Sequence, residues 1–184
     1  MLENLWAGWR RDYVESAVDG PGSNSIQSGP GSVFSRILAS GLSDEATHIV
    51  WRGRRCFAIM NAYPYTNGHL LVMPYREIAA LDALGEDEHD ELWDAVRTAV
   101  GVVKSVYNPD GVNVGMNLGA AAGAGVPTHL HAHVLPRWNG DTNAMTAIAG
   151  VRVMPETLES SARRIREGWI RAVASKAPSV LIDE

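Results

Sequence analysis

The sequence has little cysteine, little lysine and no long apolar run, and each shortage excludes a class of protein. Its single cysteine, Cys56, rules out an internal disulfide framework and any multi-cysteine zinc or iron–sulfur site. No run of about 18 apolar residues occurs, and the first residues have neither the basic start nor the apolar segment of a secretion signal. We therefore expect a cytoplasmic protein that does not associate with a membrane.

The charge balance limits the kind of ligand. The chain carries 16 basic and 21 acidic residues, for a formal net charge of −5, and all the basic residues except Lys104 and Lys176 are arginines. Such an acidic chain is not suited to binding long nucleic acid through its phosphates. A small phosphorylated ligand is still compatible, because an arginine guanidinium can form paired hydrogen bonds with phosphate.

The N-terminal segment differs in composition from the rest of the chain. Residues 1–18 place Trp6, Trp9 and Tyr13 at helical spacing, which predicts an amphipathic helix with an aromatic stripe. From position 19 to position 32, ten of the fourteen residues are Gly, Pro or Ser. This composition cannot bury enough apolar surface to order itself, so it predicts a flexible linker.

The chain as a whole divides into three parts. Its 184 residues fit one domain with additional segments at its ends. We assign the N-terminal helix and linker to residues 1–32, the domain to residues 33–150, and a C-terminal helix and tail to residues 151–184. The last part is expected to pack on the domain or on its dimer partner.

Apolar patterning within the domain predicts both strands and helices. Two β-rich runs flank a turn at Gly53 and predict a hairpin, and the Asn67-Gly68 pair predicts a second turn. Because strands and helices do not alternate regularly, we expect an α+β fold: an antiparallel sheet of about five strands, one long central helix and terminal helices. The expected strands cover residues 47–52, 55–61, 69–74, 112–118 and 128–136, and the expected helices cover residues 86–107 and 158–173.

Three histidines alternate along the last expected strand. Side chains of a strand point to opposite faces in turn, so His129, His131 and His133 would share one face while the apolar residues between them face the core. Two interpretations follow: a metal site with imidazole ligands, or nucleophilic catalysis by one imidazole that the others orient. The second is favoured because no carboxylate follows shortly after the histidines, whereas Arg137 suits an anion.

A loop rich in glycine and alanine precedes these histidines. Residues 115–125 contain four glycines and one amide side chain, Asn117, and small residues let backbone N–H groups approach a phosphate. The loop has neither the ending of a Walker motif nor a dinucleotide-binding fingerprint. Its position beside the histidines indicates a phosphate platform.

The histidine segment resembles the signature of a known family. Residues 129–135 match the pattern His-φ-His-φ-His-φ-φ of the histidine triad (HIT) family, where φ is apolar, and residues 61–74 resemble the second signature of that family. The resemblance covers about residues 33–140 and implies a HIT-like fold. The flanking sequences are most similar to the bacterial diadenosine tetraphosphate phosphorylase/hydrolase branch.

The resemblance implies a mechanism and a set of site residues. His131 would attack the α-phosphate of a nucleotide and form a nucleotidyl-histidine intermediate, while His129 and His133 would orient it and hydrogen-bond the phosphate oxygens. Asn61 matches a position that contacts the ribose. The remaining residues expected to bind substrate are Asn117, Gly123, Gly125 and Thr128.

Two departures from the family pattern concern the structural metal site and the molecule that accepts the nucleotidyl group. Where many relatives have Cys-x-x-Cys and a histidine, this chain has Ser32, Ser35 and Glu77, so we expect no structural zinc and no tightly bound cofactor. Mg²⁺ would enter only with the polyphosphate substrate. Thr128 is the one hydroxyl residue shortly before the first triad histidine, which leaves water and inorganic phosphate both open as acceptors.

The leading hypothesis is therefore an enzyme, a HIT-type hydrolase or transferase that cleaves dinucleoside polyphosphates such as diadenosine tetraphosphate. The resemblance also implies a homodimer, with a tetramer as the alternative. Three other functions are considered: a HIT-type nucleoside phosphoramidase, a nucleotide-binding module with little catalysis, and a metal-dependent enzyme with three histidine ligands.

Overall fold

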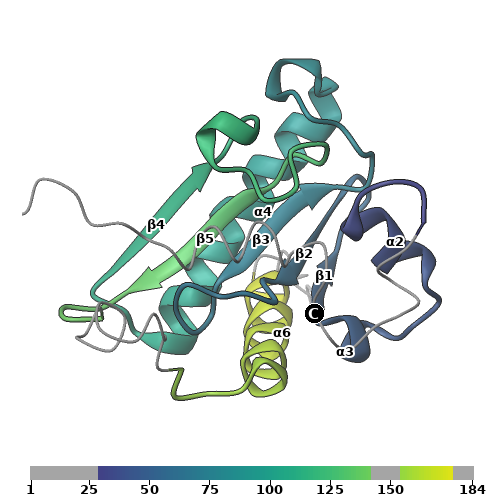
Figure 1. Cartoon of the computed structure of the whole chain (residues 1–184). Coiled ribbons are helices and arrows are strands. Elements are labelled where there is room, and N and C mark those ends of the chain that lie inside the picture. Colours follow the sequence, from purple (N-terminus) through teal and green to yellow (C-terminus); the bar gives the residue numbers. More distant parts are fainter. Residues whose placement is uncertain (1–28, 142–153, 176–184) are drawn as a thin grey trace, which may run out of the picture.

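A single five-stranded antiparallel sheet organises the protein (Figure 1). The structure is a computed structural model that describes residues 29–141 and 154–175. The strand order is β1-β2-β3-β5-β4, so β4 lies at an edge and β5 lies next to it. The strands are β1 (Ile49–Arg52), β2 (Cys56–Met60), β3 (Leu70–Pro74), β4 (Gly111–Met116) and β5 (Ala132–Arg137). The predicted α+β class is confirmed.

Two long helices, α4 (Glu86–Tyr107) and α6 (Leu158–Ala174), pack on each other and on one face of the sheet. The predicted bounds of both helices are close to those observed. At the start of α4 the Glu88 carboxylate accepts a hydrogen bond from the backbone N–H of Gly85, and Asn108 ends the helix in the left-handed conformation.

The two faces of the sheet bury different clusters. Leu70 and Val72 of β3 belong to the larger core with α4 and α6, whereas Leu71 and Met73 belong to a smaller core on the other face. This alternation follows from the two-residue period of a strand. His133 pairs with Leu71 and so lies on the face of the smaller core.

Two short helices before the sheet were not predicted. They are α2 (Val33–Ala39) and α3 (Asp44–Thr47), and a serine caps the start of each: the hydroxyl of Ser32 accepts from the N–H of Ser35, and Ser43 caps α3 in the same way. Figure 1 shows both helices at the β1 end of the sheet. Two 3₁₀ turns, η1 (Leu81–Ala83) and η2 (Ala120–Ala122), complete the described elements.

Some predicted bounds were wrong for local reasons. The first strand starts at Ile49, because Thr47 still belongs to α3. The last strand starts at Ala132 rather than Thr128, because pairing with β3 begins opposite Val72. The helix α6 is joined to the region of α3 and β1, because the guanidinium of Arg166 donates to the carbonyl oxygens of Asp44 and Ile49.

The only cysteine of the sequence, Cys56, starts β2 and is fully buried. Burial raises the pKa of its thiol to about 12, and the nearby carboxylates of Glu91 and Glu88 act in the same direction. The thiol is therefore protonated at neutral pH, and the reactive thiolate is scarce.

Two predicted features fall on other parts of the chain. The aromatic N-terminal helix lies outside the described residues, as does most of the linker. Among the residues that the structure describes, no helix combines the length and the apolar character needed to cross a membrane.

The contact between α4 and α6 predicts a large difference between two glycine variants. A Cβ at Gly168 would lie 2.7 Å from a methyl carbon of Val106 and 3.0 Å from one of Val102, whereas a Cβ at Gly101 meets nothing within 4 Å. We expect Gly168→Ala to lower the free energy of unfolding by about 1–3 kcal/mol through overpacking. Gly101→Ala, also in a helix interior, should raise it by roughly 0.5–1 kcal/mol. Urea unfolding measures both, and equal effects would contradict this view of the helix contact.

Candidate active site

His131, the central histidine, lies directly before β5 and is buried. Its Nδ1 lies 2.8 Å from the backbone carbonyl oxygen of His129. A carbonyl oxygen can only accept, so Nδ1 carries the proton and donates it. Burial lowers the pKa of His131, so the ring is neutral at pH 7 and its Nε2 has a free lone pair. His131 is therefore held in the tautomer of a nucleophile.

His133 is paired with a fourth histidine, His69. The His69 ring accepts at Nδ1 from the backbone N–H of Tyr65 (3.1 Å), and the side-chain amide of Asn61 lies 3.2 Å from the same nitrogen. In the neutral ring the proton is then on Nε2, which lies 2.9 Å from Nδ1 of His133. His133 accepts at Nδ1, and its own proton is therefore on Nε2.

This Nε2–H of His133 is a buried hydrogen-bond donor. Burial, together with a smaller effect of the neighbouring His131, lowers the pKa of His133 to about 4, so the ring is neutral at pH 7. Nε2 is buried and has no hydrogen-bond partner among the residues that the structure describes. A buried polar group without a partner is costly, which makes this N–H a candidate for binding a ligand oxygen. The ring centroids of His131 and His133 are 4.9 Å apart.

His129 is placed differently from the other two triad histidines. It is fully buried, and both of its ring nitrogens are bonded within the chain: Nε2 lies 2.9 Å from the carbonyl oxygen of Pro74 and Nδ1 2.7 Å from the hydroxyl of Ser32. A direct contact of this ring with phosphate would require one of these bonds to break. Its observed contribution is the carbonyl oxygen that holds His131.

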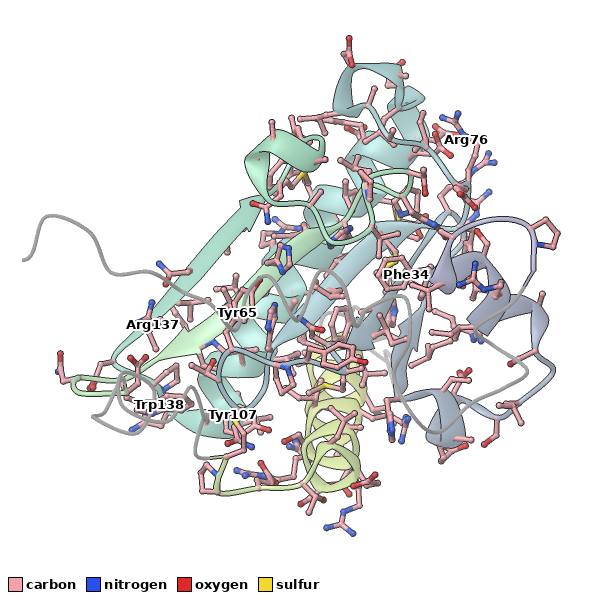
Figure 2. The ribbon with its side chains drawn as sticks, viewed as in Figure 1. Phe34, Tyr65, Arg76, Tyr107, Arg137 and Trp138 are labelled. Atoms are coloured by element: carbon pink, nitrogen blue, oxygen red, sulfur yellow. The ribbon has the colours of Figure 1, made fainter. Side chains whose placement is uncertain are left out.

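Two aromatic residues contact the histidines, and Figure 2 labels both of them, Phe34 and Tyr65. Phe34 of α2 meets His129 and His131 edge-on, with ring centroids 5.4 Å and 5.5 Å apart. Tyr65, from the turn before β3, stacks on His133 at 6.2 Å. These rings exclude water from the backs of the imidazoles, which explains their lowered pKa values.

Asn61 lies at the end of β2 and is buried. Its side-chain oxygen accepts from the N–H of Tyr63, and its amide nitrogen contacts His69. The structure thus brings Asn61 into the histidine cluster through His69, while the predicted ribose contact stays a prediction.

The glycine loop joins β4 to the histidine segment. The amide of Asn117 donates to the carbonyl oxygen of Gly123, which has a positive φ of 87°. Gly125 and Thr128 are exposed on the same loop. Asn117 therefore shapes the predicted phosphate platform, and contacts of these four residues with substrate stay predictions.

Arg137, considered above as a residue suited to an anion, is engaged elsewhere. Its guanidinium forms a paired salt bridge with Asp141, just beyond β5, and also donates to Asn113. The carboxylate of Asp141 already neutralises this charge, so the predicted role of Arg137 towards an anion stays a prediction.

Sequence reasoning missed three contributors to the site. The pairing of His69 with His133 could not be predicted, because the two residues are 64 positions apart in the chain. Ser32 and Phe34 were missed with α2, whose seven residues are too few for a periodic signal. The serine before an apolar run was a possible N-cap signal for that helix.

The sheet and the cluster of neutral imidazoles define an α+β protein with a histidine cluster as its candidate active site. The family model of the HIT domain matches residues 43–140, which is more than half of the chain. The chain belongs to the histidine triad family.

Known proteins with similar sequences include an "AP-4-A phosphorylase" of Mycobacterium tuberculosis, 41% identical over 170 residues, which cover 92% of this chain and 86% of that protein. A "Bis(5'-nucleosyl)-tetraphosphatase [asymmetrical]" of Schizosaccharomyces pombe is 33% identical over 95 residues, 52% of each chain. Among solved structures, a Zn-bound histidine triad family protein from Mycobacterium smegmatis superimposes with a TM-score of 0.65 at 24% identity, covering 79% of this chain and 98% of that one. This last likeness shows the fold.

The buried histidines predict that the protein loses stability on mild acidification. A histidine whose pKa is lowered by folding takes up its proton more readily in the unfolded chain, so acid favours unfolding. For His133, the free energy of unfolding should decrease as the pH falls from 6.5, the ordinary pKa of histidine, to about 4. Urea unfolding as a function of pH should show this decrease, and His133→Phe should make it shallower. The same slope in both proteins would contradict the lowered pKa.

Proposed function

We propose that this chain cleaves dinucleoside polyphosphates, with diadenosine tetraphosphate as substrate, through a covalent intermediate on His131. The observation that carries the proposal is the pair of tautomers at the site: a bare Nε2 on His131 beside an Nε2–H on His133. The relatives that match this chain support it, because one is named a phosphorylase and another a tetraphosphatase of such substrates.

In the first step, the Nε2 lone pair of His131 forms a bond to the α-phosphorus. The bond from that phosphorus to the oxygen that bridges to the β-phosphate breaks, and ATP leaves with the electron pair. The imidazole becomes a cation in this step. Its Nδ1–H donates to the carbonyl oxygen of His129, which stabilises the new positive charge.

His133 stabilises the charge on the phosphoryl group in this step. Its Nε2–H donates a hydrogen bond to a phosphoryl oxygen as negative charge develops there. Because His69 donates to Nδ1 of His133, the ring cannot rotate its proton away from the site without losing that bond. The donor is therefore in place before the substrate arrives.

In the second step an acceptor attacks the phosphorus, and the N–P bond electrons return to His131. The relative that aligns with 92% of this chain is named a phosphorylase, which favours inorganic phosphate as the acceptor and ADP as the product. Water would instead give AMP. ATP is the product of the first step in both cases.

The products test the proposal directly. The purified protein is incubated with diadenosine tetraphosphate, with and without inorganic phosphate, and the nucleotides are separated by chromatography. We expect ATP and ADP in equal amounts when phosphate is present. ATP with AMP would identify a hydrolase. Binding of AMP without any cleavage would overturn the enzymatic proposal and leave a binding module.

We also propose that no resident metal takes part and that Mg²⁺ enters with the polyphosphate. The ring nitrogens support this, because both nitrogens of His129 and the facing nitrogens of His69 and His133 are already hydrogen-bonded. Three free imidazole lone pairs therefore do not converge on one point. Metal analysis of the purified protein tests this, and a stoichiometric metal whose removal abolishes activity would favour the metal-dependent alternative.

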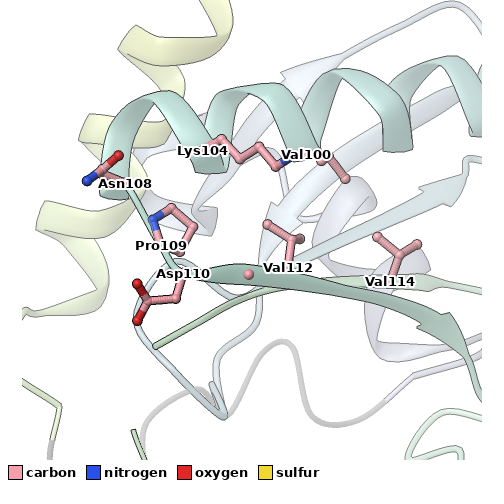
Figure 3. A pocket seen from close by; sticks show the side chains of 8 residues that line it. Val100, Lys104, Asn108, Pro109, Asp110, Val112 and Val114 are labelled. Carbon is pink, nitrogen blue, oxygen red and sulfur yellow. The ribbon is translucent and has the colours of Figure 1, made fainter. Parts of the chain in front are cut away.

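We infer that a second copy of the chain pairs along β4. This edge strand exposes Val114, whose exposed fraction is 44%, and Trp93 of α4 is 40% exposed. Between α4 and β4 lies a cavity of about 420 Å³, lined by valines together with polar and charged residues such as Lys104 and Asp110 (Figure 3). Light scattering should give the mass of a dimer, and Val114→Glu should shift it towards the monomer. A monomeric wild type would overturn this inference.

A cytoplasmic location completes the proposal. The single free thiol of Cys56 is typical of a reducing compartment. Cell fractionation followed by immunodetection tests it, and recovery with exported proteins would contradict it.

A further inference from the structure

The segment that carries the nucleophile is not held by the sheet. Pairing of β5 with β3 begins at Ala132, so the backbone of His129 and His131 lies beyond the strand ladder. One backbone hydrogen bond, from the N–H of Leu130 to the carbonyl oxygen of Ile78 (2.6 Å), ties this stretch to the chain after β3. The orientation of the His129 carbonyl, on which the His131 tautomer depends, needs further support.

Ser32, Ser35 and Glu77 supply a group of hydrogen bonds next to this segment, here named the serine–glutamate cluster. The Glu77 carboxylate accepts from the backbone N–H of Ser32 and from the hydroxyl of Ser35, both at 2.7 Å. The hydroxyl of Ser32 lies 2.7 Å from Nδ1 of His129. The cluster therefore joins the start of α2, the chain after β3 and the histidine segment.

The direction of the hydrogen bonds in this cluster can be assigned. The carbonyl oxygen of Pro74 can only accept, so His129 carries its proton on Nε2. Burial lowers the pKa of His129, and the neutral ring then accepts at Nδ1 from the hydroxyl of Ser32. The Ser32 oxygen in turn accepts from the N–H of Ser35. Each donor has a matching acceptor, which fixes one orientation of the ring.

The charge of Glu77 is part of this arrangement. The hydrogen bond from the backbone N–H of Ser32, followed by those from the hydroxyls of Ser35 and Thr128, lowers the pKa of its carboxyl. Ionised Glu77 cannot donate, so the Ser35 hydroxyl must point at it and leaves the Ser32 hydroxyl free to point at His129.

We propose that Ser32 and Glu77 are positioning residues of the active site: they fix the ring of His129, and through its carbonyl oxygen they hold His131 ready to attack. This inference rests on the proposed function, in which His131 is the nucleophile. Neither residue touches the reacting phosphorus. They act before the chemical step, by removing other orientations of the His129 ring and backbone.

The same cluster also places an aromatic wall of the site. Ser32 caps α2, and Phe34 in the first turn of that helix contacts the rings of His129 and His131. Loss of the Ser32 hydroxyl therefore removes a cap, a hydrogen bond to His129 and part of the restraint on Phe34.

A matched pair of variants separates positioning from helix capping. Ser32→Ala and Ser43→Ala each remove the N-cap hydroxyl of a short helix, but only Ser32 contacts a histidine. Both should lower the melting temperature. Only Ser32→Ala should lower kcat for diadenosine tetraphosphate, by about 10–100-fold, with KM changed by less than about threefold. Ser32→Thr keeps the hydroxyl and should restore most of kcat.

A spectroscopic readout decides the proposal independently of turnover. Ring ¹⁵N chemical shifts distinguish a protonated from a bare nitrogen. In the wild type we expect a protonated Nε2 and a bare Nδ1 on His129, and the opposite pattern on His131. Ser32→Ala should alter the His129 pattern, and Ser43→Ala should not. If the wild type fails to cleave the substrate, the proposed function fails, while these spectra still test the positioning role.

Three outcomes would overturn the proposal. The first is a Ser32→Ala protein with the kcat and the histidine spectrum of Ser43→Ala. The second is a Ser32→Thr protein as slow as Ser32→Ala. If Ser32→Ala does not fold, Glu77→Ala takes its place, because that side chain is largely exposed. Glu77→Ala should lower kcat and broaden or shift the His129 signals. The third outcome that would overturn the proposal is a Glu77→Ala protein with unchanged kcat and an unchanged histidine spectrum.

Discussion

His131→Ala is expected to abolish cleavage of diadenosine tetraphosphate, with kcat reduced by at least about 10⁴-fold. The variant has no lone pair at the position of Nε2, so the covalent intermediate cannot form. Nucleotide binding should persist, since the other contacts to the phosphates are unchanged. Turnover measured by product chromatography and AMP affinity measured by calorimetry report the two effects separately.

Two further variants serve as controls for this result. His131→Asn should be equally inactive but closer to the wild type in stability, because the asparagine amide can donate to the carbonyl oxygen of His129 as Nδ1 does. His89→Ala removes an exposed imidazole from α4 and should leave kcat unchanged. A His131 variant that forms products at a substantial rate would refute the assignment of the nucleophile.

His133→Ala should lower kcat by roughly 10²–10³-fold, the usual effect of removing one donor from a developing negative charge. The neutral ring supplies a hydrogen bond rather than a full charge, because burial holds the pKa of His133 at about 4. KM should change little, since the contact strengthens in the transition state. Steady-state kinetics at pH 7 measures the effects on kcat and on KM separately.

His133→Gln distinguishes a hydrogen-bond donor from a proton-transfer residue. The amide nitrogen of glutamine reaches about as far as Nε2 of histidine and can donate a hydrogen bond, but it does not transfer a proton. We expect His133→Gln to recover kcat to within about tenfold of the wild type. A glutamine variant as slow as the alanine variant would show that the imidazole itself is needed. This result would contradict the tautomers assigned to His69 and His133, which make His133 only a hydrogen-bond donor.

Regular elements could be predicted because their residues repeat at a fixed period. In α4, Leu92, Val96 and Val103 mark one face over 22 residues, and the acidic first turn and Asn108 mark its ends. The same holds for the hairpin and for β3, whose turns carry glycine at the required positions. Long periodic segments thus give both the type of element and its approximate bounds.

The start of β5 shows where such patterns mislead. Apolar and polar residues alternate from His129 onward, which is the signal of a strand, and the apolar members are indeed buried. Pairing nevertheless stops at Ala132, because β3 bonds only as far as Val72 opposite it. The length of a strand depends on its neighbour, which a single sequence does not reveal.

At the site, the family could be predicted from the triad, but the contacts that support the triad could not. The alternating histidines identify the family, and the structure adds which nitrogen of each ring carries a proton. That assignment depends on Ser32 and His69, which lie 97 and 64 positions from their partners. Contacts over such distances leave no periodic trace in the chain.

The burial of Cys56 makes the protein well suited to site-specific labelling at an introduced cysteine. Maleimides and similar reagents combine with thiolates, and this thiol is both fully buried and protonated at neutral pH. A cysteine introduced at an exposed position, such as Ser40 at the end of α2, would therefore take up a fluorophore or spin label selectively. Movements of α2 relative to the histidines could then be followed during turnover without first removing the native thiol.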